Sequence, residues 1–339
     1  MRTRRAAAAA IIAAMTVAVS GGCTDDVPSP AAAPSASAAE AADRGIVDMV
    51  SVVEPSVVTI HTDEGLGSGV IYRADGVIVT NAHVVGPATR VQVSFADGTQ
   101  LPGQVTGSDD LTDLAVLKVG RTGLPAVTVR QELPRQGETA LALGSPLGFE
   151  NTVTQGIISG VSRQIPGSGA GGRPLVDLVQ TDAPISPGNS GGALVDAQGR
   201  LVGINEAYIP PSAGAVSLGF AIPASTVVDV TEQLLKDGKV SHPYLGVVLT
   251  TVTPQIAQAL GMKVTSGALV RQVQPNSPAA TAGIRARDVI VRFEDSTVRT
   301  VGDIYAALRK AKPGEKAVLK VNRNGTVTDI PVTLGTLSR

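Results

Sequence analysis

The sequence is poor in cysteine, aromatic residues and histidine. A single cysteine among 339 residues excludes an internal disulfide and a cysteine-rich metal cluster, so stability must come from packing. Aromatic residues make up 2% of the chain, tryptophan is absent, and histidine occurs only at positions 61, 83 and 242. The formal net charge is -1 and there is no long basic run, which argues against DNA or RNA as a partner.

The N-terminus has the layout of an export signal. Three arginines within the first five residues precede an almost unbroken apolar run from Ala6 to Val19. This run is shorter than the roughly 20 residues that a membrane-spanning helix needs, so export is favoured over a permanent span. We expect residues 1–22 to form a signal peptide and the mature protein to act outside the cytoplasm, as a membrane-attached, periplasmic or secreted protein.

The lone cysteine, Cys23, directly follows this signal. Small residues before a cysteine at the end of an apolar run resemble the lipobox of bacterial lipoproteins, although Ser20 stands where that box usually has an aliphatic residue. A lipid on Cys23 would attach the protein to the outer face of the cytoplasmic membrane. The alternative is a cysteine that happens to lie near an ordinary cleavage site.

Composition divides the rest of the chain into three segments. Residues 23–43 are mainly alanine, serine, proline and acidic residues, which predict a flexible linker because they cannot build a core. Residues 44–238 contain short Val-, Ile- and Leu-rich runs separated by turns, which predict an all-β barrel or sandwich. Helical spacing over residues 224–236 predicts the helix that closes this domain. Residues 241–336 mix short helices and strands and predict a small α/β domain.

Local signals place elements within the last segment. Ser277 followed by Pro278 predicts a helix start, and Thr300 with Asp303 resembles a capping box. The pair Asn324-Gly325 lies between two apolar runs and predicts a hairpin.

The segment Gly188-Asn189-Ser190-Gly191-Gly192 is the most specific local motif. A nucleophilic serine must stand clear of its own backbone while amide hydrogens converge on the substrate oxygen, and flanking glycines permit both. By that geometry the amides of Gly188 and Ser190 would form the oxyanion hole. Taken alone, such a glycine-rich stretch also fits a plain β-turn.

A nucleophilic serine needs a base that works near neutral pH, and few histidines are available. His242 lies beyond the predicted β domain. His61 sits in an alternating strand, as a surface or hydrogen-bonded core histidine would. His83 instead follows an apolar strand, where a loop can present it at a cleft. Elimination therefore favours His83.

The third member must be a carboxylate that fixes the imidazole tautomer, which favours a partly buried acid. Asp113 stands at the start of the apolar run Leu114–Val119. Asp109 and Asp110 fall in a predicted turn, where we expect solvated side chains. The predicted triad is therefore His83, Asp113 and Ser190.

Four segments in this order resemble the HtrA family of serine proteases. They are Gly67-Ser68-Gly69-Val70, residues 80–85, residues 112–116, and residues 180–192. The resemblance covers roughly Val47 to Leu334. It implies a mainly β fold, with two six-stranded chymotrypsin-like barrels followed by a small α/β PDZ domain, and it implies no cofactor or metal. Family members are commonly homotrimers, but the low aromatic content argues against an aromatic N-terminal interface here.

The chain also departs from the family pattern. Ser186 stands where the family usually has Asn, Pro184 where Ala is usual, and Ala193 where Pro is common. In proteases activated by clipping, an aspartate at the position of Asn189 pairs with the new N-terminal ammonium, and a neutral amide cannot. Control is therefore expected to lie in loop ordering, with the Gly- and Ser-rich stretch 162–172 as either a sensor loop or an ordinary surface loop.

The resemblance also suggests where substrate binds. Ile204, Asn205, Leu218 and Phe220 resemble the family's pocket walls and offer no carboxylate to hold Lys or Arg, so we expect cleavage after small or medium aliphatic residues. The segment Tyr244-Leu245-Gly246-Val247 resembles the loop with which a PDZ domain holds a peptide C-terminus through backbone amides. On its own, this segment also fits the start of an ordinary strand.

Together these features predict an exported, membrane-tethered serine endopeptidase that hydrolyses misfolded or signalling proteins through an acyl-enzyme on Ser190. The expected partners are unfolded or C-terminally exposed protein chains, which the PDZ domain would deliver or whose binding it would relay. The rival hypothesis is a chaperone or scaffold whose protease fold is catalytically silent. The complete triad argues against that rival.

Overall fold

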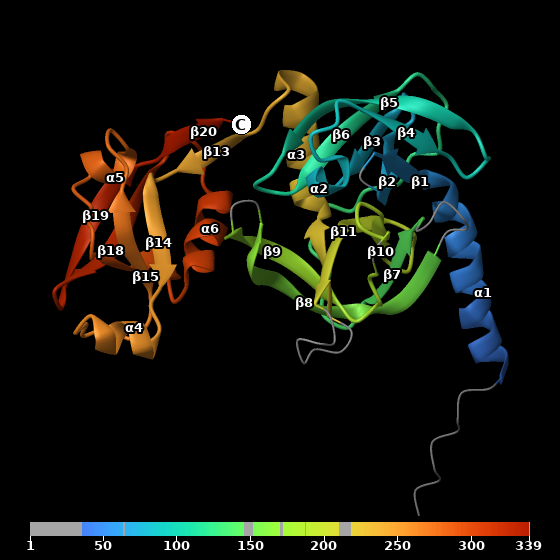
Figure 1. Ribbon diagram of the computed structural model, residues 1–339. Helices are drawn as coiled ribbons and strands as arrows, with labels where there is room; N and C mark the ends of the chain where they lie inside the picture. The colour runs from blue at the N-terminus through green and yellow to red at the C-terminus, as the bar shows by residue number, and fades with distance from the viewer. Residues whose placement is uncertain are drawn as a thin grey trace, which may run out of the picture. The chain divides into compact units, whose positions relative to one another are not determined.

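A computed structural model describes residues 36–63, 65–145, 152–169, 172–186, 188–209 and 218–338. The predicted signal peptide and Cys23 lie outside these residues. Within the described part of the chain, no helix is both long and apolar enough to cross a membrane. Strands dominate, as predicted, and they form two closed barrels followed by a smaller sheet domain (Figure 1).

The first barrel closes in the order β1-β2-β3-β6-β5-β4. Its interior is filled by apolar side chains on one face of each strand, such as Ile60, Ile71 and Leu117. Its strands are β1 (Val57–Thr62), β2 (Gly65–Arg73), β3 (Val77–Thr80), β4 (Arg90–Ser94), β5 (Gln100–Asp109) and β6 (Leu114–Val119), with the short helix α2 (Ala82–Val85) between β3 and β4 and the 3-10 turn η1 (Glu54–Ser56) before β1.

The second barrel closes in the order β10-β11-β12-β9-β8-β7. The stretch predicted as a sensor or surface loop, residues 162–172, largely belongs to the long β8–β9 hairpin, where the pairing register shifts several times. Its strands are β7 (Thr139–Gly144), β8 (Thr152–Gly169), β9 (Arg173–Thr181), β10 (Ala193–Val195), β11 (Leu201–Ile209) and β12 (Leu218–Pro223).

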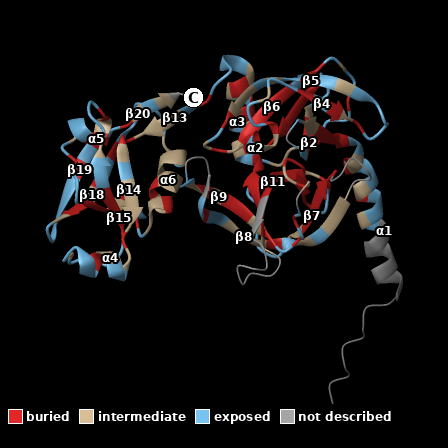
Figure 2. Cartoon of the chain, viewed as in Figure 1, coloured by how far each residue is buried: buried red, intermediate tan, exposed pale blue. Residues whose placement is uncertain are grey.

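The largest core cluster lies between the barrels rather than inside either one. It joins outer-face residues of both, for example Val79 on β3 and Leu143 on β7, and it takes in Val227 and Leu234 of helix α3 (Ala224–Asp237). Figure 2 shows buried residues along the strands of both barrels. The predicted closing helix is confirmed, and Gly238 ends it in the left-handed conformation.

Helix α1 (Ala36–Val53) begins inside the segment predicted to be a flexible linker. The difference has a local cause, because the sequence is rich in alanine from Ala36 onward and alanine has the highest helix propensity. At its C-terminal end, Met49 and Val53 pack into the core between the barrels. The predicted linker, residues 23–43, is therefore helical from residue 36.

The C-terminal domain is built on the sheet β14-β15-β16-β18-β19, with β17 paired to β16, and on the separate pair β13-β20. Its core includes Val270, Ile304 and Leu319. Its elements are β13 (Ser241–Tyr244), β14 (Val247–Thr251), α4 (Pro254–Ala259), β15 (Ala268–Val273), α5 (Pro278–Thr281), β16 (Val289–Phe293), β17 (Ser296–Thr297), α6 (Val301–Lys310), β18 (Lys316–Arg323), β19 (Thr326–Thr333) and β20 (Gly335–Ser338).

All three local signals in this domain are confirmed. The Ser277 hydroxyl accepts a hydrogen bond from the Ala280 amide at the start of α5. Thr300 and Asp303 form a complete capping box at the start of α6. Asn324 and Gly325 both have positive φ, as a type I′ turn requires, and join β18 to β19.

Candidate active site

His83 lies on the short helix α2, between β3 and β4 of the first barrel. The start of this helix is fastened to Asp113, which lies just before β6. The Asp113 carbonyl accepts hydrogen bonds from the Ala82 amide at 3.1 Å and from Asn81 Nδ2 at 3.0 Å. The imidazole therefore sits on a turn whose position is set by the backbone of its own acid partner.

The His83 ring is paired directly with the Asp113 carboxylate. His83 Nδ1 lies 2.5 Å from Asp113 Oδ2, and the His83 backbone amide donates to Asp113 Oδ1 at 2.9 Å. The His83 side chain is 48% exposed and that of Asp113 only 14%. This geometry leaves Nε2 of the imidazole free to face a substrate, and it directs the Nδ1 proton at the acid.

Asp113 occupies a conformation that few side chains adopt. Its φ is +55°, in the left-handed region, where Asp and Asn are tolerated better than most residues. This turn points the carboxylate back at α2 rather than along β6. The prediction of a partly buried acid at the mouth of an apolar strand agrees with this placement.

The predicted nucleophile loop is described from Gly188 onward, and it leads into β10. Gly191 has φ +82°, and its amide donates to the Asn205 carbonyl at 2.9 Å. The Gly192 amide donates to the Asn189 carbonyl at 2.9 Å. These bonds fold the chain back on itself around Ser190, so the glycines play the conformational part that the motif predicts.

Ser68 fastens this loop to the first barrel. Its amide donates to the Ser190 carbonyl at 2.9 Å, and its hydroxyl donates to the Gly188 carbonyl at 2.6 Å. The same hydroxyl accepts from the Ser145 amide at 2.8 Å. Ser68 thereby connects β2 of one barrel to the nucleophile loop and the end of β7 in the other. The sequence motif contained this serine, but only the fold shows the contact.

The Ser190 hydroxyl donates to the Glu206 carbonyl at 3.1 Å. Within the described part of the chain, it has no other hydrogen-bond partner, and the amides of Gly188 and Ser190 donate to no described acceptor. The assignment of these amides to an oxyanion hole stays a prediction. For attack on a carbonyl carbon, the hydroxyl must turn from Glu206 toward His83, as catalytic hydrogen bonds often do only when substrate binds.

Glu206, on β11, is a carboxyl group that sequence reasoning missed. Its side chain is 4% exposed, Asn81 Nδ2 donates to its Oε2 at 2.5 Å, and its Oε1 lies 4.0 Å from His83 Nδ1. Burial, the nearby charge of Asp113 and a hydrogen bond with Asp113 raise the pKa of the Glu206 carboxyl well above its usual value. The only available signal was an acidic residue inside an otherwise apolar strand.

His83, Asp113 and Glu206 also make the one group in the described chain whose ligand-type atoms all lie within 4.8 Å of one another. The imidazole nitrogen nearest the two acids, Nδ1, is already paired with Asp113. The arrangement therefore fits a proton-sharing network around an imidazole better than a built metal centre.

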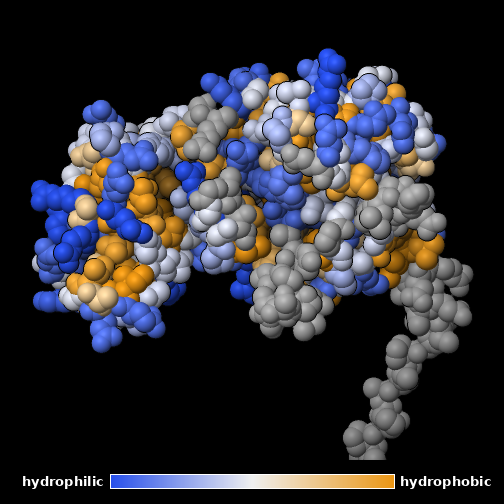
Figure 3. Space-filling view, in the orientation of Figure 1, coloured by the Kyte–Doolittle hydropathy of each residue, from blue (hydrophilic) through white to orange (hydrophobic). Residues whose placement is uncertain are grey.

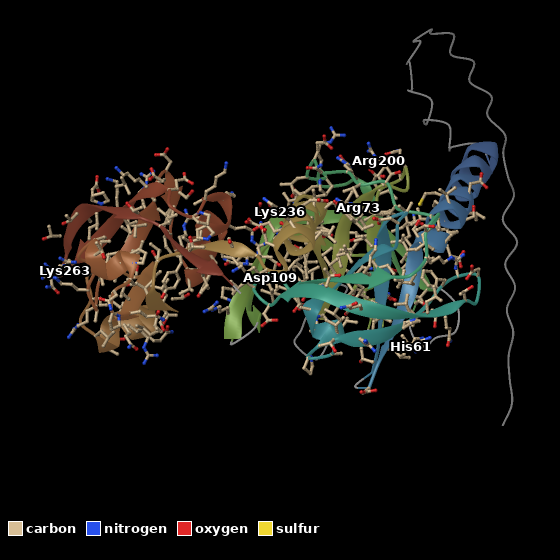
Figure 4. All side chains as sticks on the ribbon, turned by 90° about the horizontal axis from the view of Figure 1, so that it is seen from above. His61, Arg73, Asp109, Arg200, Lys236 and Lys263 are labelled. Atoms are coloured by element: carbon tan, nitrogen blue, oxygen red, sulfur yellow. The ribbon has the colours of Figure 1, made fainter. Side chains whose placement is uncertain are left out.

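Asp109 corrects one prediction, because it is completely buried rather than solvated. Its Oδ2 accepts from the Thr112 amide at 3.0 Å and from the Thr112 hydroxyl at 2.5 Å, while Oδ1 lies 2.8 Å from His242 Nε2. Figure 4 shows Asp109 at the end of β5, well apart from His61. His61 is satisfied by Ser94 Oγ at 2.9 Å, as expected for a structural histidine.

The four predicted pocket-wall residues lie on β11 and β12, and all except Leu218 are buried. Ile204 and Phe220 belong to the core between the barrels, and Leu218 packs against it. Asn205 is buried, and its Nδ2 donates to the carbonyls of Leu143 and Ala193, both at 3.1 Å. Asn205 therefore supports the strands behind Ser190, and the role of these residues in substrate choice stays a prediction.

The predicted peptide-binding segment, Tyr244 to Val247, borders a hollow in the C-terminal domain. Leu249, Ile304 and Leu308 add an apolar lining, and protease-domain residues such as Arg173 and Val176 also border it. Figure 3 shows apolar side chains gathered on this side of the domain, over β14. A strand edge beside an apolar hollow is the setting in which a peptide adds to a sheet.

Gly246 has a structural reason to be glycine. Its φ is +81°, and an added Cβ would overlap the Ser277 side chain. Its carbonyl accepts from the Gln274 amide at 2.9 Å. The turn between β13 and β14 thus brings its backbone close to the start of α5, which a larger residue would prevent.

Comparisons with known proteins agree with this arrangement. A trypsin-like peptidase domain matches residues 67–204, and a PDZ domain matches residues 243–334. A protein of Pseudomonas putida named "Probable periplasmic serine endoprotease DegP-like" is 40% identical over 275 residues, which are 81% of this chain and 57% of that protein. The chain thus spans little more than half the length of such curated relatives.

Solved structures match over a larger share of their length. The HtrA-type protease AlgW with a decapeptide shares 34% identity at a TM-score of 0.70, over 86% of this chain and 98% of that one. The serine endoprotease from Yersinia pestis shares 33% identity at a TM-score of 0.66, over 86% and 97%. With both domains, their order and the His83–Asp113 pair in place, the chain belongs to the HtrA family of serine proteases.

Proposed function

We propose that this protein is an extracytoplasmic serine endopeptidase that hydrolyses peptide bonds through an acyl-enzyme on Ser190. The observation that carries the proposal is the His83–Asp113 pair, held at 2.5 Å beside a serine loop that Ser68 fastens across the barrels. Family membership supports the same reaction class. The following steps assign a task to each residue.

The first step forms the acyl-enzyme. As Ser190 Oγ bonds to the carbonyl carbon of the substrate, the hydroxyl proton passes to His83 Nε2, and Asp113 stabilises the resulting imidazolium. The carbonyl oxygen becomes an oxyanion, for which the amides of Gly188 and Ser190 are the proposed donors. The C–N bond then breaks, and the leaving amine takes the proton from His83.

The second step reverses these roles with water. A water molecule gives a proton to His83 Nε2 as its oxygen attacks the ester carbon, and the same proton returns to Ser190 Oγ as the C–O bond breaks. Each donor in an oxyanion hole is typically worth about 2.7 to 4 kcal/mol of the barrier. The enzyme returns to its starting protonation state without a cofactor taking part in any step.

For substrate choice, we propose unfolded or misfolded chains with small or medium aliphatic residues before the cleaved bond. Supporting this, the described residues around β11 and β12 carry apolar side chains, and Glu206, the acid there, is occupied by Asn81 and Asp113. The PDZ domain would bind substrate C-termini along the edge of β14, with an aliphatic end side chain in the hollow lined by Leu249 and Ile304.

The place of action is proposed from the first residues and from relatives named as periplasmic. A signal peptide over residues 1–22 would export the chain, and a lipid on Cys23 would attach it to the outer face of the cytoplasmic membrane. Globomycin-type inhibition of lipoprotein processing, read as a change in electrophoretic mobility, tests the lipid. Sedimentation of the purified protein tests assembly as a homotrimer, which the family resemblance suggests.

The deciding experiment for activity is digestion of unfolded casein by the purified chain, beside a Ser190→Ala variant. We expect the unmodified chain to produce fragments and the variant to produce none. If no serine-dependent cleavage occurs, even with peptides that bind the PDZ domain, the catalytically silent chaperone or scaffold becomes the better interpretation.

A further inference from the structure

Glu206 lies next to all three residues of the predicted triad. The resemblance to the HtrA family did not predict a role for this residue. Its backbone carbonyl accepts from Ser190 Oγ at 3.1 Å, its Oε1 lies 4.0 Å from His83 Nδ1, and carboxylate oxygens of Glu206 and Asp113 lie within 4.8 Å of each other. Because the Glu206 carboxyl is almost fully buried beside Asp113 and His83, it must either hold a proton or add a second negative charge to the site.

The contacts of the two carboxylate oxygens favour the protonated form. Asn81 Nδ2 donates to Oε2, so that oxygen is satisfied as an acceptor. The Glu206 carboxyl also lies within 4.8 Å of the Asp113 carboxylate, which already accepts from the amide and ring of His83. Two ionised carboxylates this close together repel each other where both are largely buried, whereas one shared proton turns the repulsion into a hydrogen bond.

We propose that Glu206 is a positioning residue: in its acid form it donates a hydrogen bond to Asp113 and holds that carboxylate in register with His83. Asp113 then accepts from three donors, namely the His83 ring, the His83 amide and the Glu206 hydroxyl. The site keeps a single negative charge to stabilise the imidazolium. The inference rests on the proposed protease function, since it concerns the efficiency of the same triad.

We expect the activity to depend on pH through the Glu206 carboxyl. The titratable groups that face Glu206 are Asp113 from the turn before β6 and His83 from α2. Below the raised pKa of Glu206, the hydrogen bond is present. As pH rises through that pKa, the donor is lost and a second negative charge appears, so activity should decline on the alkaline side.

Three variants separate positioning from packing. Glu206→Leu keeps an apolar group of similar size without a donor, and we expect kcat to fall about tenfold with KM nearly unchanged, the effect of one lost hydrogen bond of roughly average strength. Glu206→Gln keeps a donor and should recover most of that loss, but without the alkaline decline. Glu138→Leu is the matched control, because Glu138 is a hydrogen-bonded carboxyl whose partners are Arg130 and Arg135.

A carboxyl titration tests the protonation state without any need for activity. In the Ser190→Ala protein with 13C-labelled glutamate, the signal that Glu206→Gln removes should remain at its protonated position at pH 7, while exposed glutamates titrate near their usual pKa of about 4.3. Titration of Glu206 together with those exposed groups would overturn the proposal, and so would an alkaline limb that is the same in Glu206→Gln. Absence of serine-dependent cleavage would instead contradict the proposed protease function. The titration of Glu206 could still be measured in that case.

Discussion

At the residue scale, the backbone at Gly191 passes so close to the first barrel that no side chain fits. An added Cβ would overlap the carbonyl oxygen of Ser68 and the hydroxyl of Thr80. The φ of +82° also lies in the region that disfavours all residues with a Cβ. The position next to the nucleophile therefore carries both a conformational and a steric demand.

A matched pair of variants separates these two demands. Gly98 has φ +80° in the turn between β4 and β5, with nothing within 4 Å of an added Cβ. Gly98→Ala should therefore cost only the left-handed strain, about 1 to 2 kcal/mol, and leave cleavage nearly unchanged. Gly191→Ala should lose more stability and lower kcat/KM at least about 100-fold, because the loop must move away from Ser68. Urea unfolding and peptide cleavage measure both, and equal activities in the two variants would contradict this account.

Ser68 gives a second prediction at this scale. Ser68→Ala removes a hydroxyl that donates to the Gly188 carbonyl at 2.6 Å and accepts from the Ser145 amide at 2.8 Å. Two groups of the nucleophile region then lack a partner, so we expect a loss of about 1 to 3 kcal/mol in the free energy of unfolding and a lower kcat with little change in KM. Ser51→Ala, whose hydroxyl only meets the Asp48 carbonyl of its own helix, is the control. A rise in KM alone would indicate that Ser68 acts on substrate binding instead.

At the element scale, the turn from Asp109 to Asp113 joins β5 to β6 and carries Asp113, the predicted catalytic acid. Burial opposes the charge on Asp109, but hydrogen bonds from His242 and Thr112 outweigh it and lower the pKa of this carboxyl. A lowered pKa in the folded state means stability that is present above the unfolded value of about 3.8 and is lost as pH falls below it.

Asp109→Asn tests the turn. The amide cannot carry the charge that the three donors favour, so we expect the variant to be about 1 to 3 kcal/mol less stable at pH 7, with a lower kcat because Asp113 lies at the end of the same turn. The stability gap should persist between pH 7 and about pH 4 and close only below that range. Urea midpoints at pH 7, 5 and 3 measure it, and a gap that closes already at pH 5 would contradict a lowered pKa of Asp109.

Features that depend on residues close in the sequence could be predicted from it. Features that depend on contacts between residues far apart in the sequence could not. The capping box at Thr300, the proline start at Pro278 and the Asn324-Gly325 turn depend on neighbours within a few residues, and all three are confirmed. Asp109 was placed in solvent because its partner His242 lies 133 residues away. Its burial is decided by a contact between domains, which no local pattern carries.

The candidate site shows the same division. His83, Asp113 and Ser190 follow from motifs and elimination, and the structure pairs His83 with Asp113. Glu206 was missed because the sequence of β11 is mainly apolar. The importance of its single acidic residue becomes visible only when the fold brings this strand next to His83 and Asn81. The link from Ser68 to Gly188 spans 120 residues and crosses from one barrel to the other. Closing two barrels against each other creates contacts that motif spacing does not contain.

At the scale of the whole molecule, the proposed protease function depends on both barrels together. The largest core cluster lies between the barrels, and β1 and β2 both contact β7. The predicted triad thus draws on both barrels, with His83 and Asp113 from the first and Ser190 from the loop that leads into β10 of the second. A shift of one barrel against the other would change the distance between the His83 ring and the Ser190 hydroxyl. Ser68 resists such a shift, because its hydrogen bonds join the first barrel to the serine loop of the second.

The PDZ domain carries the last prediction, which concerns recognition of a free carboxylate. A peptide ending in valine should bind along β14, and the same peptide with an amidated end should not, because the backbone amides of the Tyr244–Val247 loop would have no carboxylate to hold. Gly246→Ala should weaken binding at least about tenfold, since its Cβ would overlap Ser277. Gly238→Ala shares a positive φ, +68°, with open space around the added Cβ, and it should bind as the unmodified protein does.

Fluorescence anisotropy with a labelled peptide measures these affinities, and cleavage kinetics extend them to the protease. If the PDZ domain delivers substrates, casein fused to the valine-ended tail should show a lower KM than the amidated form, and Gly246→Ala should abolish the difference while kcat stays the same. Equal binding of amidated and free peptides would show that the hollow beside β14 recognises an apolar segment rather than a chain end, and the assignment of the Tyr244–Val247 loop would then be wrong.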